Sequence, residues 1–146
     1  MRVLLVNGPN LNLLGSREPD IYGTTTLADI ERSVEERARA LGCSVIAFQS
    51  NSEGHIIDFL QANAGGADGL IINPGALTHY GLSLRDCLAA LGVPAIEVHI
   101  SNIYSREPFR RRSVTAPACR GVITGLGAQG YLLALEALVT LATESR

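Results

Sequence analysis

Short runs of apolar residues alternate along this chain with longer segments in which apolar residues recur every three or four positions. The short runs are rich in leucine and β-branched residues, and the first of them ends at the turn residues Gly8 and Pro9. Such runs are typical of buried strands. They predict five strands, at Arg2–Asn7, Ser44–Gln49, 70–73, 95–100 and Gly121–Thr124.

The segments with helical spacing lie between these strands. Thr26 and Asp29 suit the first turn of a helix as a capping pair, apolar residues then recur as far as Leu41, and Gly42 follows as a stop signal. Similar stripes predict three more helices, at 56–64, 82–91 and 130–142.

Continuous apolar strands that alternate with amphipathic helices are typical of a parallel sheet covered on both faces. Five such strands in 146 residues favour an α/β fold: a flavodoxin-like three-layer sandwich with a five-stranded parallel sheet. The length suits one domain, over residues 1–146. Two connections, 8–25 and 101–120, are longer than this architecture needs, and we expect them to form a lid or a binding site.

The amino-acid composition limits the reactions and partners that can be expected of this chain. All 12 basic residues are arginine, so the chain has no lysine amine with which to form an imine. The net charge is −2, which gives no reason to expect a nucleic acid or a membrane as partner. No apolar run is long enough for a signal peptide or a membrane span, so a cytoplasmic location is expected. Cys43, Cys87 and Cys119 form no metal or redox spacing and are expected to be buried, reduced thiols.

Polar residues gather where the predicted strands end, and ligands of such sheets bind at that edge. Glu97 and His99 are two apart in a strand and leave the same face, so the carboxylate can orient the imidazole and favour its protonated form, which suits a general acid. Alternatively, the two side chains merely satisfy one another at a buried strand end. His79 follows a glycine turn, where it either binds a ligand or packs within the loop.

Arg17 and Tyr22 lie in the first long connection. A tyrosine acts as a base near neutral pH only if a positive charge stabilises its phenolate, and Arg17 could supply that charge. Both can equally be surface residues.

Two further motifs have conventional functional interpretations. The basic run 106–112 suggests phosphate or nucleic acid, but the acidic composition favours arginines that pair internally while one of them binds a ligand. The run 125–130 satisfies the dinucleotide pattern GxGxxG, but the chain ends after one more helix. These glycines are expected to allow close packing of helix and strand instead.

Taken together, the motifs resemble the type II 3-dehydroquinate dehydratases. The resemblance covers essentially the whole chain and rests on six ordered segments: NGPNLNLLGSREPDIYG at 7–23, SNSEGHIID at 50–58, NPGALTH at 73–79, EVHISN at 97–102, SREPFR at 105–110 and GLGAQGYLLAL at 125–135. It implies a single catalytic domain that eliminates water from 3-dehydroquinate through an enolate, with no cofactor, imine or metal. The family's assembly implies a homododecamer built from trimers.

The resemblance also implies roles for individual residues. Tyr22 is similar to the base that removes the proton next to the ketone, and Arg17 to the group that holds this tyrosine as phenolate. Asn10 is implied to stabilise the enolate oxygen, His99 to protonate the departing hydroxyl and Glu97 to orient the imidazole. The residues implied to bind the substrate are Asn73, His79, Ile100 through its backbone, Ser101, Arg110 and, from a neighbouring subunit, Asp86.

Some positions depart from the family pattern, namely Leu77, Tyr80, Gly81, Arg111 and Arg112. They leave the proposed catalytic groups intact and put in question the shape of the site floor and the contacts of the lid. The same reaction serves aromatic amino acid biosynthesis and, alternatively, quinate catabolism. A nucleotide- or flavin-binding module and a non-catalytic scaffold of this fold are the rival functions.

Overall fold

The structure is a computed structural model that describes residues 1–16 and 18–144. Within this part of the chain, five parallel strands form one sheet in the order β2-β1-β3-β4-β5. This is the strand order of the flavodoxin-like fold, so the predicted α/β class is confirmed. The strands are β1 (Arg2–Asn7), β2 (Ser44–Gln49), β3 (Gly69–Asn73), β4 (Ala95–His99) and β5 (Gly121–Thr124).

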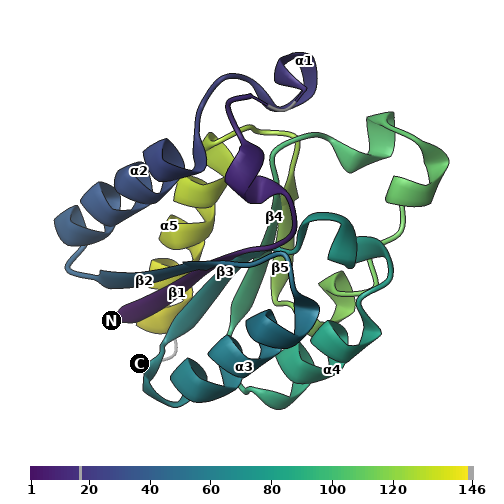
Figure 1. The fold of residues 1–146 in the computed structure, drawn as a ribbon. Helices are drawn as coiled ribbons and strands as arrows, with labels where there is room; N and C mark the ends of the chain where they lie inside the picture. Colours follow the sequence, from purple (N-terminus) through teal and green to yellow (C-terminus); the bar gives the residue numbers. More distant parts are fainter. Residues whose placement is uncertain (17, 145–146) are drawn as a thin grey trace.

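Helices cover both faces of the sheet. Figure 1 shows α2 and α5 over one face and α3 and α4 over the other, while the short α1 projects beyond the end of the sheet. Because α1 is only four residues long, it has no periodic pattern from which the sequence could predict it. The helices are α1 (Pro19–Tyr22), α2 (Leu27–Ala40), α3 (Glu53–Asn63), α4 (Leu82–Ala90) and α5 (Gln129–Glu144).

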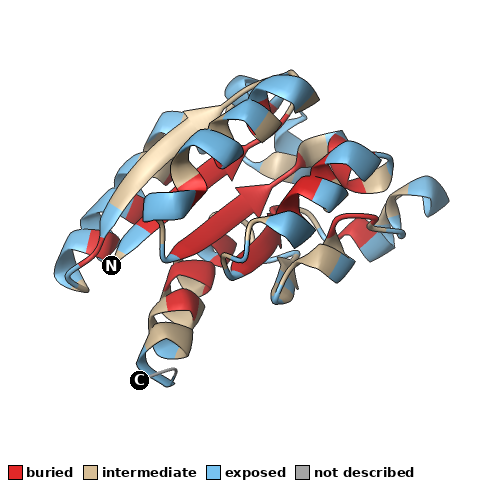
Figure 2. Ribbon diagram, turned by 90° about the horizontal axis from the view of Figure 1, so that it is seen from below, coloured by how far each residue is buried: buried red, intermediate tan, exposed pale blue. Residues whose placement is uncertain are grey.

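The core consists of two layers that the sheet separates. Successive side chains of a strand point to opposite faces, so Val3 and Leu5 of β1 pack toward α2 and α5, whereas Leu4 and Val6 pack toward α3 and α4. All four are almost inaccessible to water. Figure 2 shows the burial concentrated in the middle strands, with the edge strand β2 only half-buried. The central strands are therefore a rigid support for the loops at their ends.

The capping pair predicted for the first helix is confirmed. The Asp29 backbone N–H donates to Thr26 Oγ1, and the Thr26 backbone N–H donates to the Asp29 carboxylate, both at 3.1 Å. This capping box satisfies two of the free N–H groups of the first turn. It fixes where α2 begins and hence where the first long connection ends.

Close approaches between neighbouring segments explain two glycines. A Cβ at Gly130 would lie 3.2 Å from Val98 Cγ1, so this glycine lets α5 pack closely on β4. The close packing of helix and strand expected for the GxGxxG segment is confirmed at Gly130 but not at Gly127, where a Cβ would meet nothing within 4 Å. A Cβ at Gly8 would lie 2.4 Å from the carbonyl oxygen of Pro74, and the Gly8 N–H donates to the Asn73 carbonyl at 2.8 Å. The loops after β1 and β3 are thus in direct contact.

Cys43 and Cys87 are buried and Cys119 is half-buried, and all three are free thiols. In the described part of the chain, no helix combines the length and apolar character that crossing a membrane requires.

Candidate active site

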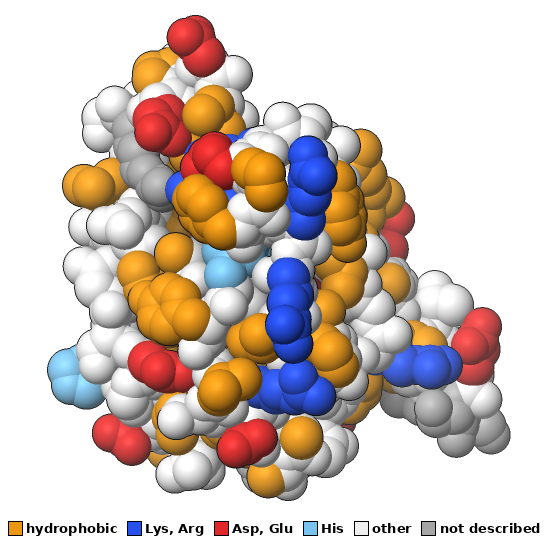
Figure 3. Space-filling view, turned by 90° about the vertical axis from the view of Figure 1, so that its right-hand side faces the viewer, with side chains coloured by type: hydrophobic (Ala, Val, Ile, Leu, Met, Phe, Trp, Pro, Cys, Tyr) orange, Lys and Arg blue, Asp and Glu red, His pale blue; other side chains and the backbone are white. Residues whose placement is uncertain are grey.

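A cavity of about 230 Å³ opens at the edge of the sheet where β1, β3 and β4 end. Figure 3 looks onto this side of the molecule and shows a histidine at the bottom of a hollow, with arginine side chains in a column beside it. The cavity brings together residues from four separate segments of the chain. Eight of the residues predicted for the site line it: Asn10, Tyr22, Asn73, His79, His99, Ile100, Ser101 and Arg110.

Two predicted site residues, Glu97 and Asp86, do not line this cavity, and a third falls outside the part of the chain that the structure describes. Glu97 is fully buried and contacts His99 rather than the cavity. Asp86 is exposed on α4. Its implied role belongs to a neighbouring subunit's site, so that role stays a prediction. Arg17 lies outside the described residues.

The Glu97 carboxylate, at the end of β4, accepts hydrogen bonds from three side chains. His99 Nε2 and Ser113 Oγ each lie 2.9 Å from its Oε2 atom, and Thr115 Oγ1 donates to Oε1. Ser113 also accepts a hydrogen bond of 2.9 Å from the backbone N–H of Ala116. Since Ser113 and Thr115 belong to the second long connection, the buried carboxylate attaches that loop to the sheet.

These contacts decide the charge of the carboxylate. Burial alone raises the pKa of Glu97, because removal from water disfavours the ionised form. The hydrogen bonds from His99, Thr115 and Ser113, together with attraction to His99, outweigh burial and hold the pKa below its ordinary value. Glu97 is therefore ionised at neutral pH.

An ionised carboxylate can only accept hydrogen bonds, so the Nε2 atom of His99 carries the proton in this pair. The predicted contact between the two side chains is confirmed, and it leaves Nδ1 as the ring nitrogen for the cavity that His99 lines. His79, which also lines the cavity, donates from Nδ1 to the carbonyl of Arg112 at 2.8 Å, which leaves its Nε2 atom for a ligand. In each ring, one nitrogen is thus held by a protein oxygen, which fixes the orientation of the ring and leaves the other nitrogen for a ligand.

Asn10 has a left-handed backbone, with φ of 69°, which asparagine tolerates better than most residues. Its backbone N–H donates to Asn51 Oδ1 at 2.9 Å. Gln49 reinforces the turn, because its amide nitrogen lies 3.3 Å from the same Asn51 oxygen and 3.2 Å from the carbonyl of Gly8. The end of β2 therefore holds the turn that carries Asn10 at the cavity.

Arg106 is the main residue that the sequence did not single out. Its Nη1 atom donates to the Tyr22 hydroxyl oxygen at 2.7 Å, and its guanidinium lies 5.2 Å from the centre of the Tyr22 ring. The arginine side chain is only 11% exposed and lies 3.7 Å from Glu18 and 3.8 Å from Glu107. The basic run 106–112 was the available signal, and its first arginine proves to be the one beside the tyrosine.

Asn73 ends β3 and is buried apart from its contact with the cavity. Its amide oxygen accepts from the backbone N–H of Gly75 at 3.1 Å, and its amide nitrogen donates to Tyr131 at 2.9 Å. Tyr131 is a fully buried residue of α5. In the sequence it stands out only as a part of the segment GLGAQGYLLAL at 125–135.

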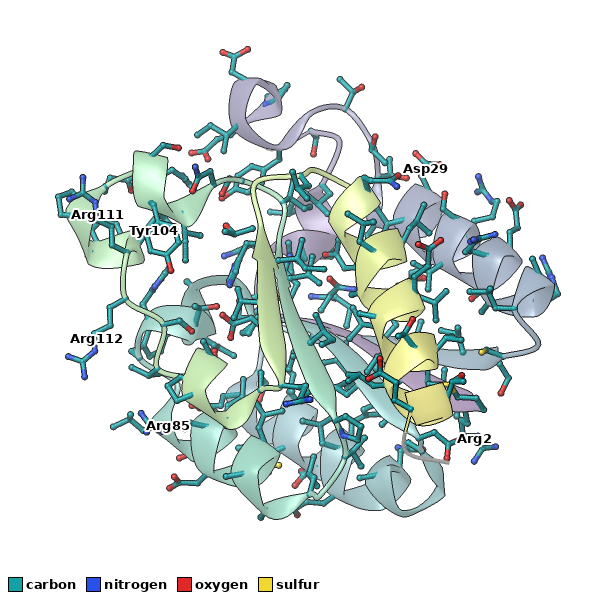
Figure 4. The ribbon with its side chains drawn as sticks, turned by 180° about the vertical axis from the view of Figure 1, so that it is seen from behind. Arg2, Asp29, Arg85, Tyr104, Arg111 and Arg112 are labelled. Carbon is teal, nitrogen blue, oxygen red and sulfur yellow. The ribbon has the colours of Figure 1, made fainter. Side chains whose placement is uncertain are left out.

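The departures from the family pattern lie mostly away from the cavity. Leu77 is buried in the core layer between the sheet and helices α3 and α4, and Tyr80 is exposed. A Cβ at Gly81 would lie 2.7 Å from the carbonyl of Leu77, so the turn requires glycine there. Arg111 and Arg112 are exposed, and Figure 4 shows their side chains directed away from the sheet.

Among residues 1–16 and 18–144, no group of three or more histidine, cysteine, aspartate or glutamate side chains is arranged to hold a metal ion. The cavity instead holds two oriented imidazoles, a phenol next to a guanidinium, and several amide and hydroxyl groups. Such groups can move protons and bind a small polyhydroxylated anion.

Known proteins similar to this chain have names that point to one family. A curated relative from Roseiflexus castenholzii, named 3-dehydroquinate dehydratase, is 60% identical over 139 residues, which cover 95% of this chain and 88% of that protein. A relative from Neosartorya fischeri, named catabolic 3-dehydroquinase 1, is 54% identical over 134 residues, covering 92% and 89%.

Solved structures lead to the same family. The type II dehydroquinase of Butyrivibrio crossotus superimposes with a TM-score of 0.93 at 46% identity, covering 94% of this chain and 97% of that one. The model of the family described as Dehydroquinase class II matches residues 1–139. The chain therefore belongs to the class II dehydroquinase family.

Proposed function

We propose that this chain, as one catalytic domain, eliminates water from 3-dehydroquinate to give 3-dehydroshikimate through an enolate. One observation carries the proposal: a single cavity is lined both by a tyrosine beside a largely buried arginine and by a histidine beside a buried carboxylate. The names of the relatives support the substrate. The absence of lysine from the chain rules out an imine to a lysine amine.

In this proposal Tyr22 is the base that removes the proton next to the ketone. The electron pair of that C–H bond then forms the enolate. A phenol serves as a base near neutral pH only when a cation favours its phenolate. The contact of 2.7 Å with Arg106 supports this role, and the resemblance adds Arg17 as a second cation.

Asn10 stabilises the developing enolate oxygen, in the manner of an oxyanion-binding amide, with a water between the two. The hydrogen bond from its backbone to Asn51 supports this role, because it holds the residue at the cavity before substrate arrives. A group that is already oriented stabilises the transition state without a cost of reorganisation.

His99 is the general acid of the second step. As the enolate returns to a ketone, the bond between the ring and the hydroxyl breaks and the new ring double bond forms. His99, protonated on both nitrogens, gives the proton on Nδ1 to the leaving oxygen, so that water leaves, and keeps the Nε2 proton in its hydrogen bond to Glu97. The ionised Glu97 stabilises the protonated imidazole and fixes its orientation. Hydroxide is a poor leaving group, so this proton is essential.

The remaining polar groups of the cavity bind the carboxylate and hydroxyls of the substrate. The residues proposed for this are Asn73, His79, Ile100 through its backbone, Ser101 and Arg110, with Asp86 reaching the site of a neighbouring subunit in a dodecamer of trimers. The reaction is the same in aromatic amino acid biosynthesis and quinate catabolism, and it requires no cofactor.

The reaction can be followed directly by ultraviolet absorbance, because 3-dehydroshikimate is a conjugated enone and 3-dehydroquinate is not. We expect the absorbance to rise when metal-free protein is mixed with 3-dehydroquinate, and to rise equally after pretreatment with borohydride, which traps imines. Folded protein that gives no rise would overturn the proposed function in favour of a non-catalytic scaffold.

Removal of the Tyr22 hydroxyl should abolish proton abstraction while leaving most substrate contacts. We expect Tyr22→Phe to lower kcat by about 10²- to 10⁴-fold, the usual contribution of a general base, with a much smaller change in KM. Tyr104→Phe is the matched control, because Tyr104 is 58% exposed, and it should keep wild-type kinetics. Near-normal kcat in Tyr22→Phe would exclude this residue as the base.

The ionised state of Glu97 should appear in the stability of the protein. Thr115→Val keeps the shape of the side chain but removes one hydrogen bond to the carboxylate, a loss of about 2 kcal/mol in the free energy of unfolding at pH 7. Because the native pKa of Glu97 is lowered, its stabilising contribution is present above the ordinary glutamate value and is lost as the pH falls through the native pKa.

The difference in stability between wild type and Thr115→Val should therefore shrink on acidification, as measured by urea unfolding at pH 7 and at successively lower pH. Thr143→Val, at an exposed hydroxyl that bonds only to the carbonyl of Val139 within the described structure, is the control. A difference that stays constant or grows toward low pH would show that Glu97 is not held ionised by Thr115.

A further inference from the structure

A chain of buried hydrogen bonds connects Asn73, at the cavity, to the interior of the fold. Asn73 Nδ2 lies 2.9 Å from the Tyr131 hydroxyl, and that hydroxyl lies 2.7 Å from Asn7 Oδ1. The three residues come from β3, α5 and β1, and none is more than 4% exposed.

The direction of each hydrogen bond follows from one backbone group. The N–H of Gly75 can only donate, and it lies 3.1 Å from the side chain of Asn73, so the atom that it meets is the amide oxygen. The amide nitrogen of Asn73 is therefore the atom that faces Tyr131, and it donates to the hydroxyl oxygen. The Tyr131 hydroxyl must then donate its own proton to Asn7.

Tyr131 is suited to this task because it keeps its proton. Burial raises the pKa of this phenol above its ordinary value, so the hydroxyl keeps its proton near neutral pH and remains both a donor and an acceptor.

The arrangement also has a cost for stability. The Nδ2 atom of Asn7 is buried and has no hydrogen-bond partner among the described residues. A buried amide without a partner destabilises the folded state, and an apolar trio of similar shape would avoid this cost. Polar groups kept at such a cost next to a cavity suggest a role in the site rather than in folding.

We propose that Tyr131 is a positioning residue, which holds the Asn73 amide so that its nitrogen presents a hydrogen-bond donor to the ligand. The amide nitrogen carries two hydrogens; one is used by Tyr131, and the other is available to the cavity that Asn73 lines. The amide oxygen is held by the backbone N–H of Gly75. The ligand group that meets the amide nitrogen must be an acceptor, such as a carboxylate or hydroxyl oxygen.

This inference rests on the proposed function, because its test uses 3-dehydroquinate as the substrate. Tyr131→Phe keeps the ring and removes the hydroxyl, which frees the amide of Asn73 to turn. We expect KM to rise about tenfold, the value of one hydrogen bond, while kcat changes little, since Tyr131 touches no reacting atom.

A double-variant cycle separates positioning from a general structural effect. If Tyr131 acts through Asn73, Tyr131→Phe should not raise KM further in an Asn73→Ala background. Leu138→Ala is the control for lost stability, because Leu138 is buried in the same helix and does not line the cavity, and its KM should remain that of wild type. A wild-type KM in Tyr131→Phe, or an equal rise in both backgrounds, overturns the inference.

Two further measurements keep the test decisive. If Tyr131→Phe alone does not fold, the pair Tyr131→Phe and Asn7→Leu removes the unpaired amide as well and should fold, with the same raised KM; a wild-type KM in that pair contradicts the inference. Wild-type protein that fails to convert 3-dehydroquinate overturns the proposed function itself, whereas active wild type with an unaffected Tyr131→Phe overturns only the role of Tyr131.

Discussion

The geometry of the site depends on one buried negative charge, the carboxylate of Glu97. A carboxylate without access to water is tolerated only when its oxygens are fully hydrogen-bonded. Here His99 lies beside it on the same strand, and Ser113 and Thr115 reach it from the long connection before β5. The same contacts therefore orient the imidazole and attach the loop to the sheet, so the proposed acid chemistry and the local fold depend on one carboxylate.

A second constraint is the contact between the loops that follow β1 and β3. The backbone at Gly8 approaches Pro74 so closely that no side chain fits between them. This contact brings the segments that carry Asn10 and Asn73 to one small cavity. The parallel sheet brings strand ends to a common edge, but it is the glycine that allows their loops to meet there. Below these loops, Tyr131 extends the network of hydrogen-bonded polar groups into the core. Buried polar groups there lower the stability of the fold, and in our proposal they hold the Asn73 amide in place at the site.

Much of this could be predicted from sequence, because strands and helices have their own periodicity. The strand positions, the capping pair Thr26 and Asp29, and the contact of Glu97 with His99 all follow from spacing within a segment. Contacts across long separations could not be predicted in this way. Arg106 lies 84 residues from Tyr22, and within a basic run nothing distinguishes it from its neighbours. Likewise, Tyr131 fits the apolar stripe of α5 and shows its polar role only in three dimensions.

The most direct test of this account is the protonation of the His99 ring, observed by ¹⁵N–¹H NMR with the signals assigned by the His99→Asn variant. The account predicts a proton on Nε2 near neutral pH, shifted strongly downfield by the carboxylate, and loss of that shift in Glu97→Gln. An Nε2 atom that carries no proton, or a proton signal unchanged in Glu97→Gln, would contradict the claim that an ionised Glu97 orients the imidazole of His99.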